Sequence, residues 1–159
     1  MLDSLQSFTE SLPPALQWLG VILLGAIPFV ESYFGSFIGV VAGLSPWVAV
    51  PAAIVGNVIS MLIFVFSAHG VRHAATKNRE AKPLSPRRAK LKERFERFGV
   101  PGVSLLGQLV LPSQITSAAI VGFGASRNAV IFWQVISIIL WGIVFGVLAM
   151  LGVQAAGRF

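Results

Sequence analysis

Two long stretches without a charged residue, 46–68 and 128–153, constrain the fold of this chain more than any other feature of its sequence. A helix needs ~20 predominantly apolar residues to cross the hydrocarbon core of a bilayer, so each stretch can cross once. Only 11% of the 159 residues are charged and 55% are hydrophobic, whereas a soluble domain carries about 25% charged residues. We therefore expect an all-α, multi-pass integral membrane protein.

Two further apolar stretches, 16–44 and 100–125, are interrupted near their middle. Proline removes an amide donor and clashes with the preceding turn of a helix. Irregular backbone inside a membrane survives only where protein or water covers it. We therefore predict two re-entrant helical hairpins, each followed by one full transmembrane helix. The interruptions are Pro28 and Glu31 in the first stretch and Pro112, Ser113 and Gln114 in the second.

Short sequence echoes relate the two halves of the chain. Residues 57–60 read Asn-Val-Ile-Ser and residues 134–137 read Gln-Val-Ile-Ser, while Leu-Leu-Gly occurs at both 23–25 and 105–107. These echoes indicate an internal duplication within a single membrane domain, 1–159. Each copy would cross the membrane once, so the copies must be inverted, as in secondary transporters whose site lies at the bilayer midplane.

The basic residues are concentrated between the two predicted repeats, about 16–69 and 100–153. No Lys or Arg precedes Arg72, and ten of the twelve basic residues lie between Arg72 and Arg97. Basic residues near transmembrane ends stay on the cytoplasmic side, so we predict that 70–99 is a cytoplasmic loop. Because this rule already explains the charge, we predict no nucleic-acid partner.

The basic loop contains one predicted helix. Ser85 suits an N-cap, Pro86 suits the first helical position, and Gly99 can end the helix. Apolar residues share one face and basic residues surround it, which is typical of a helix lying on anionic lipid. The predicted lipid-surface contacts are Arg87, Arg88, Lys90, Arg94, Phe95 and Phe98, with Leu91 on the same apolar face.

Glu31 is the only acidic residue inside the apolar segments, and it lies at the break of the first hairpin. A carboxylate at membrane depth is expensive and usually marks an ion or substrate pathway. Because burial disfavours the ionised form of a carboxyl, we interpret Glu31 as a proton carrier or a counter-ion. The alternative is a residue near the outer interface that is simply neutral or reaches water.

Other polar side chains at comparable depth complete the predicted site. Each hydroxyl or amide could instead bridge two helices, and that alternative stays open. The pair at the second break, Ser113 and Gln114, is the one that we favour for substrate contact. The predicted substrate- or proton-binding residues are Glu31, Ser32, Asn57, Gln108, Ser113, Gln114 and Gln134.

Neither a metal site, another cofactor nor an enzyme activity is predicted. Cysteine is absent, and His69 and His73 have no acidic companion at ligand spacing. No Ser/His/Asp constellation or phosphate loop occurs. Glycines that recur every fourth residue predict close helix packing, and these are Gly35, Gly39 and Gly43, then Gly142 and Gly146.

Four short motifs resemble the small multidrug export proteins, distant relatives of the DedA/VTT membrane proteins. They are Glu-Ser-Tyr-Phe-Gly at 31–35, Gly-Asn at 56–57, Phe-Gly-Val-Pro-Gly at 98–102 and Leu-Pro-Ser at 111–113. The resemblance covers roughly 19–152. It implies two hairpins that face each other from opposite sides of the membrane. It also implies gradient-driven transport of small amphipathic molecules or polyprenyl-phosphate lipid, with Glu31 as the acidic hairpin residue.

The chain departs from the DedA pattern in the second hairpin. Where DedA proteins resemble one another in Arg-Phe-x-Pro-x-x-Arg, this chain has Gln108 and Gln114. Arg or Lys would be expected to hold a phosphate head group. A site with one acidic residue and no basic residue suits a cation better than a phosphate group.

We therefore predict a transporter that exports small lipophilic cations or drugs in exchange for protons, through a midplane site at the two hairpin tips. One alternative is a flippase or scramblase of polyprenyl-phosphate lipid, and another is a structural membrane protein without transport. The expected location is the plasma membrane of a bacterium. Asp3 and Glu10, with no base nearby, favour an external N-terminus. The partners would be the bilayer, a small amphipathic cation or lipid, and, at 17.0 kDa, a second copy in a homodimer.

Replacing Leu91, Phe95 and Phe98 with serine should release the loop helix from the membrane while both spans still insert. Burial of each side chain contributes about 1.5–3 kcal/mol, so the triple change removes most of the apolar attachment. Protease protection of the loop in membrane vesicles measures this. Protection equal to that of the unchanged protein would contradict a membrane-bound loop helix.

Overall fold

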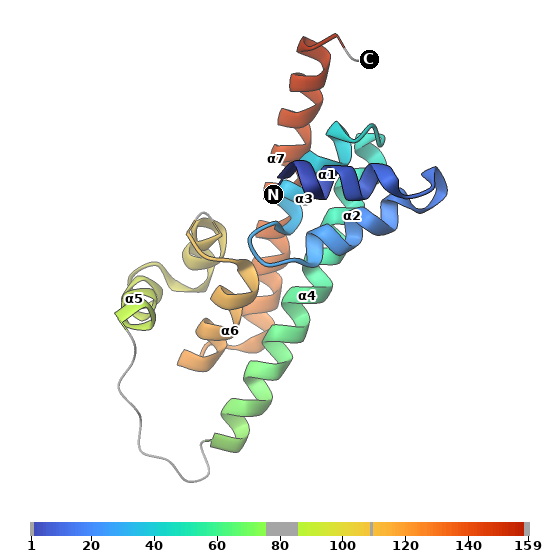
Figure 1. Cartoon of the computed structure of the whole chain (residues 1–159). Helices are drawn as coiled ribbons and strands as arrows, with labels where there is room; N and C mark the ends of the chain where they lie inside the picture. Colours follow the sequence, from blue (N-terminus) through green and yellow to red (C-terminus); the bar gives the residue numbers. More distant parts are fainter. Residues whose placement is uncertain (1, 76–85, 109, 158–159) are drawn as a thin grey trace. The chain divides into compact units, whose positions relative to one another are not determined.

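The computed structural model describes residues 2–75, 86–108 and 110–157. Within these ranges the regular elements are helices and no strand occurs, so the all-α prediction is confirmed (Figure 1). In chain order they are α1 Leu2–Ser11, the 3-10 helix η1 Pro14–Leu16, α2 Gln17–Ala26, α3 Glu31–Val41, α4 Pro46–Ala75, α5 Pro86–Gly107, α6 Ser113–Phe123 and α7 Arg127–Ala155.

The two stretches predicted to cross a membrane form single long helices. α4 has 30 residues and α7 has 29. Both are long and apolar enough to cross a membrane, over Pro46–Val71 and Arg127–Ala155. Each begins directly after a serine whose carbonyl accepts a first-turn N–H, from Ala49 to Ser45 (2.9 Å) and from Val130 to Ser126 (3.0 Å). Pro46 occupies the first helical position of α4, where its missing N–H costs nothing.

The interruptions in the other two apolar stretches are real breaks between helices. α2 ends at Ala26 before α3 begins at Glu31, and α5 ends at Gly107 before α6 begins at Ser113. Glu31, Ser113 and Gln114 therefore lie in the first turn of the helix after each break, slightly later than the sequence indicated. In both halves a helix, a break, an eleven-residue helix and a long helix follow one another in the same order.

The eleven-residue helices α3 and α6 end with the same cap. A glycine with positive φ, 94° at Gly43 and 113° at Gly124, follows each helix. The N–H of this glycine and of the next residue donate to carbonyls of the last turn, which is a Schellman motif. The bonds are Gly43 to Val40 (3.0 Å), Leu44 to Gly39 (3.1 Å), Gly124 to Val121 (3.1 Å) and Ala125 to Ile120 (3.2 Å).

The predicted packing role of Gly43 is therefore wrong. No atom lies within 4 Å of the position that its Cβ would take, so it makes no close helix contact. Its positive φ ends α3 instead, a conformation that only glycine adopts at no steric cost.

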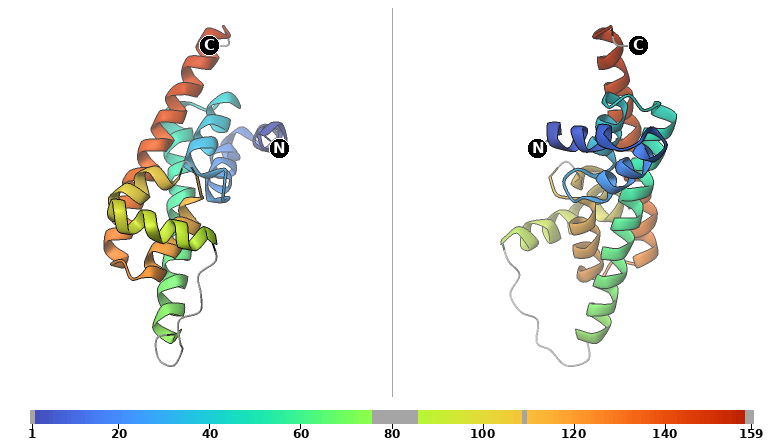
Figure 2. Two further views of the ribbon diagram at one scale, coloured as in Figure 1. Left: turned by 90° about the vertical axis from the view of Figure 1, so that its left-hand side faces the viewer. Right: turned by 45° about the vertical axis from the view of Figure 1, so that its right-hand side comes forward.

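The described chain forms two compact units, Met1–Ser60 with Ile138–Phe159 (unit 1) and Met61–Ser137 (unit 2). In unit 1, α1 packs on α2 and α3, and α2 packs on α3 (Figure 2). α1 was not predicted from the sequence. The spacing of Leu5 and Thr9, one helical turn apart, could have indicated this helix. Leu5 packs against the core residues Leu24, Val30 and Ile38, and Thr9 is buried.

Glycines let the backbones of unit 1 approach closely. A Cβ at Gly25 would overlap the carbonyl of Ala53, and a Cβ at Gly56 would overlap the carbonyl of Ile22. A Cβ at Gly35 would lie 3.2 Å from the backbone nitrogen of Gly25. α2 is thus held directly against α4 and α3 with almost no side chain between them.

The last part of α7 packs in unit 1 in a similar way. A Cβ at Gly142 would lie 2.9 Å from Ile54 Cγ1 and 3.3 Å from Ser32 Cβ. A Cβ at Gly146 would overlap Val50 Cγ2. The packing role predicted for Gly142 and Gly146, and for Gly35, is confirmed.

In unit 2, Gly99 divides α5 into two segments. Its φ of 66° and ψ of −174° interrupt the helix, as predicted for the end of the loop helix, and Pro101 follows near the start of the second segment. The side chains of Lys90 and Phe98 are exposed. The predicted N-cap Ser85 and the side chains of Arg87, Arg88, Leu91, Arg94 and Phe95 lie outside the described residues.

Two glycines of α4 provide a matched test of the close packing. Gly56→Ala should lower the stability by about 1–3 kcal/mol or more, because the added methyl forces two backbones apart. Gly70→Ala should be neutral or stabilise by up to about 1 kcal/mol, because its Cβ meets nothing within 4 Å and alanine favours the helix. Thermal unfolding in detergent, followed by circular dichroism, measures both, and equal effects would contradict the backbone contact.

Candidate functional site

Glu31 is held at the start of α3 by an unusual backbone. Its side chain is fully buried, and its N–H donates to the carbonyl of Ile27 at 3.0 Å. Phe29 and Glu31 both have positive φ, 71° and 53°, a conformation that costs a residue other than glycine about 1–3 kcal/mol. Such strain persists only where the surroundings enforce it, and it gathers at functional sites. The first turn of α3 also places the carboxyl at the positive end of a helix dipole.

The serines of α3 face the last part of α7. Ser32 Oγ donates to the carbonyl of Ile138 at 2.8 Å. Ser36, one turn later, is also buried, and a Cβ at Gly146 would lie 3.8 Å from Ser36 Cβ. Asn57 of α4 is fully buried in the same unit. Unit 1 therefore holds three of the predicted site residues, Glu31, Ser32 and Asn57.

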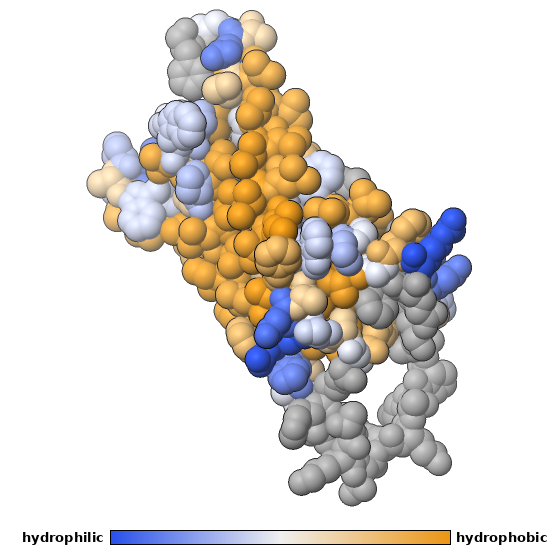
Figure 3. Space-filling view, turned by 180° about the vertical axis from the view of Figure 1, so that it is seen from behind, coloured by the Kyte–Doolittle hydropathy of each residue, from blue (hydrophilic) through white to orange (hydrophobic). Residues whose placement is uncertain are grey.

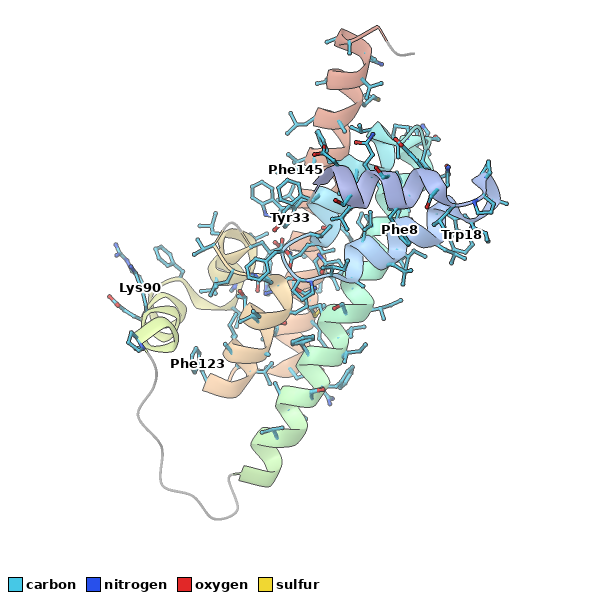
Figure 4. All side chains as sticks on the ribbon, in the orientation of Figure 1. Phe8, Trp18, Tyr33, Lys90, Phe123 and Phe145 are labelled. Carbon is cyan, nitrogen blue, oxygen red and sulfur yellow. The ribbon has the colours of Figure 1, made fainter. Side chains whose placement is uncertain are left out.

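An aromatic cluster follows Glu31 in unit 1. The Tyr33 ring lies 4.9 Å from Phe34 and 5.4 Å from Phe145, measured between centroids, and Phe145 lies 6.3 Å from Trp141. Figure 4 shows Tyr33 and Phe145 side by side. All four side chains are partly exposed. This cluster was not predicted from the sequence, although Trp141 and Phe145 lie four residues apart on α7 and Tyr33 and Phe34 directly follow Glu31 and Ser32 at the break.

Tyr33 also connects this cluster to the strained turn. Its hydroxyl donates to the carbonyl of Phe29 at 3.2 Å, and Tyr33 follows Glu31 by two residues in the first turn of α3. The faces of aromatic rings attract organic cations, and a carboxyl can bind a proton or balance a positive charge. This combination of groups has the chemistry needed to bind a lipophilic cation.

Unit 2 holds the other predicted site residues, all of which are buried. Gln108 follows α5, and its Oε1 accepts a hydrogen bond from Ser137 Oγ of α7 at 2.7 Å. Ser113 Oγ donates to Gln114 Oε1 at 3.4 Å in the first turn of α6. Gln134 lies one turn before Ser137 on α7. The structure thus brings Gln108 to α7, and it shows a hydrogen bond between the neighbouring residues Ser113 and Gln114. Ser137 was not among the predicted site residues.

No group of three or more His, Cys, Asp or Glu residues that could hold a metal ion occurs in the part of the chain that the structure describes. Comparisons with protein-family models, with curated proteins and with solved structures find no match to this chain. The resemblance to the small multidrug export proteins stays a prediction.

Proposed function

We propose that this protein is an integral membrane transporter that exports small lipophilic cations in exchange for protons at Glu31. The observation that carries the proposal is the buried position of this carboxyl, at a strained helix start with a partly exposed aromatic cluster nearby. Protonation would remove the negative charge and weaken the hold on a bound cation, and loss of the proton would restore it. One carboxyl is then enough to couple the two movements.

The exposed surface of the long helices supports insertion into a membrane. Only 44% of the most apolar part of α4 and 28% of that of α7 is buried, whereas the core helix of a soluble protein buries most of its apolar surface. Ile63, Ile143 and Leu151 are each about half exposed or more, and apolar residues cover much of the face seen in Figure 3. A bilayer is the solvent that suits this surface.

The ends of the long helices carry residues typical of a membrane–water interface. Trp47, at the start of α4, is 89% exposed, and exposed tryptophan is enriched at the level of the lipid head groups. In unit 2, the guanidinium of Arg127 lies 5.3 Å from the centroid of the Phe66 ring. A cation held at this end is expected on the cytoplasmic side.

The shared element order supports two inverted repeats with re-entrant hairpins, which our proposal places in a bacterial plasma membrane. Ser32 precedes Gly43 by eleven residues, and Ser113 precedes Gly124 by the same number. The same Schellman cap then leads to Ser45 or Ser126 and a long helix. If each hairpin enters and leaves on one side, these two serines lie on opposite sides.

Cysteine labelling tests this topology directly, because the chain has no cysteine of its own. Ser45 and Ser126 are both exposed and hold equivalent positions after the two caps. A membrane-impermeant maleimide added to intact cells should label the Ser45→Cys variant and leave Ser126→Cys unlabelled until the membrane is opened. Labelling of both variants from the same side would rule out the inverted repeat.

Glu31→Gln should abolish proton-driven efflux of a fluorescent lipophilic cation from vesicles, because glutamine keeps the shape of the side chain but cannot titrate. Glu31→Asp should retain part of the activity. Glu10→Gln is the matched control, since Glu10 is exposed on α1 and should not affect efflux. Circular dichroism and membrane fractionation check that every variant folds and inserts.

Two results would overturn the proposal. One is efflux against a gradient by the Glu31→Gln variant, and the other is cation binding that does not change between mildly acidic and mildly alkaline pH. Translocation of a polyprenyl-phosphate lipid by the unchanged protein, without cation efflux, would favour the flippase alternative. The absence of both activities in a folded, inserted protein would favour a structural role.

A further inference from the structure

A second polar cluster in unit 2 differs from the Glu31 region because it contains no charged group. Ser104 precedes Gln108 by one turn at the end of α5, and Gln134 precedes Ser137 by one turn on α7. Residues spaced in this way lie on one side of a helix. The 2.7 Å bond from Ser137 Oγ to Gln108 Oε1 joins the two sides. One carboxamide and one hydroxyl thus meet across α5 and α7, and Ser104 and Gln134 each lie about one turn from this bond along the chain.

Several polar atoms of this cluster are buried without a hydrogen bond. Ser104, Gln134 and Ser137 are fully buried and Gln108 is 5% exposed. Among the described residues, no hydrogen-bond partner is present for Ser104 Oγ, Gln108 Nε2, or either amide atom of Gln134. Buried polar side chains in proteins are nearly always satisfied, and one that is not requires an explanation. Here four such atoms belong to three side chains of one cluster.

Helix bridging explains only part of this arrangement. The bond between Ser137 and Gln108 is such a bridge, but Gln134 contributes no bridge of its own. An apolar side chain of similar length would fill the same space without the cost of burying an unpaired amide. The amide of Gln134 therefore needs a reason other than packing.

We propose that Ser104, Gln108, Gln134 and Ser137 form a binding site for an uncharged carboxamide group of a small amphipathic molecule. The unpaired amide nitrogens of Gln108 and Gln134 offer N–H donors to a carbonyl oxygen. Gln134 Oε1 offers an acceptor to the N–H of the same ligand. A charged group would be buried here without any opposite charge in the cluster, which is unfavourable, so the site selects against ammonium and carboxylate head groups.

This site goes beyond the proposed exchange at Glu31, because it lies in unit 2 and uses neutral hydrogen bonding in place of charge. Octanamide is a suitable probe, since it joins a primary carboxamide to a short apolar chain. Octylammonium and octanoate have comparable chains with a positive and a negative head group. The three compounds separate recognition of the head group from partitioning of the tail into detergent.

Nuclear magnetic resonance of protein labelled with ¹⁵N in its glutamine side chains reads out binding at the predicted atoms. On titration with octanamide, the Nε2 resonances of Gln108 and Gln134 should shift and saturate. The resonance of Gln154, exposed near the end of α7, should not. Octylammonium and octanoate should leave the resonances of Gln108 and Gln134 nearly unchanged. Equal shifts with all three compounds, equal shifts at Gln154, or no shift with octanamide would each overturn the proposal.

A substitution of similar volume provides the second measurement. Gln134→Met should weaken octanamide binding, followed at Gln108, by about tenfold or more, the loss expected for one or two hydrogen bonds. It should also keep or raise the thermal unfolding midpoint, because an unpaired buried amide is removed. Gln154→Met is the control and should change neither quantity. Unchanged binding by a folded Gln134→Met variant would contradict the site, and the titration of the unchanged protein decides the question if that variant does not fold.

The two proposals can fail separately. The Glu31→Gln variant should bind octanamide as tightly as the unchanged protein, because the side chains of the proposed site all belong to unit 2. Loss of octanamide binding in that variant, with the fold intact, would overturn the independence of the two sites.

Discussion

The packing of unit 1 depends on a direct contact between the backbones of α2 and α4. Gly25 lies on the carbonyl of Ala53, and Gly56 lies on the carbonyl of Ile22. With almost no side chain between the helices, α2 has little freedom to shift, and α3 packs against both through Gly35. The chain must then connect α2 to α3 through few residues. This tight connection can hold Phe29 and Glu31 at positive φ.

The two units contain similar helices, but the polar side chains on those helices differ. In unit 1 a single carboxyl begins the eleven-residue helix, and aromatic rings lie near it. In unit 2 the corresponding helix begins with Ser113 and Gln114, and the neighbouring polar groups are amides and hydroxyls. A titratable group can exchange protons and cations, whereas carboxamides recognise neutral groups by hydrogen bonding. α3 and α6 end in the same cap, at Gly43 and Gly124, although their first turns carry different side chains.

Much of the fold could be predicted because its signals are local. Pro28 and Pro112 placed the breaks within a few residues. The uncharged runs 46–68 and 128–153 placed the long helices, although α4 continues to Ala75. The prediction failed at Gly43, because the same four-residue spacing serves both for helix packing and for a helix cap, and only φ distinguishes them. The prediction also missed α1, because most of this helix is polar and only a small part of its surface, including Leu5 and Thr9, faces the core.

The sequence by itself determined where the two long helices and the two breaks lie, that the long helices are apolar enough for a membrane, and that Glu31 is the only acid within the apolar segments. These properties follow from local backbone geometry and from composition. Only the tertiary structure decided which distant side chains meet, such as Tyr33 with Phe145 and Ser137 with Gln108. The physical reason is that such contacts depend on the rotation of each helix about its own axis. Packing sets that rotation through close approaches such as that of Gly56 to Ile22, and no local pattern in the sequence specifies it.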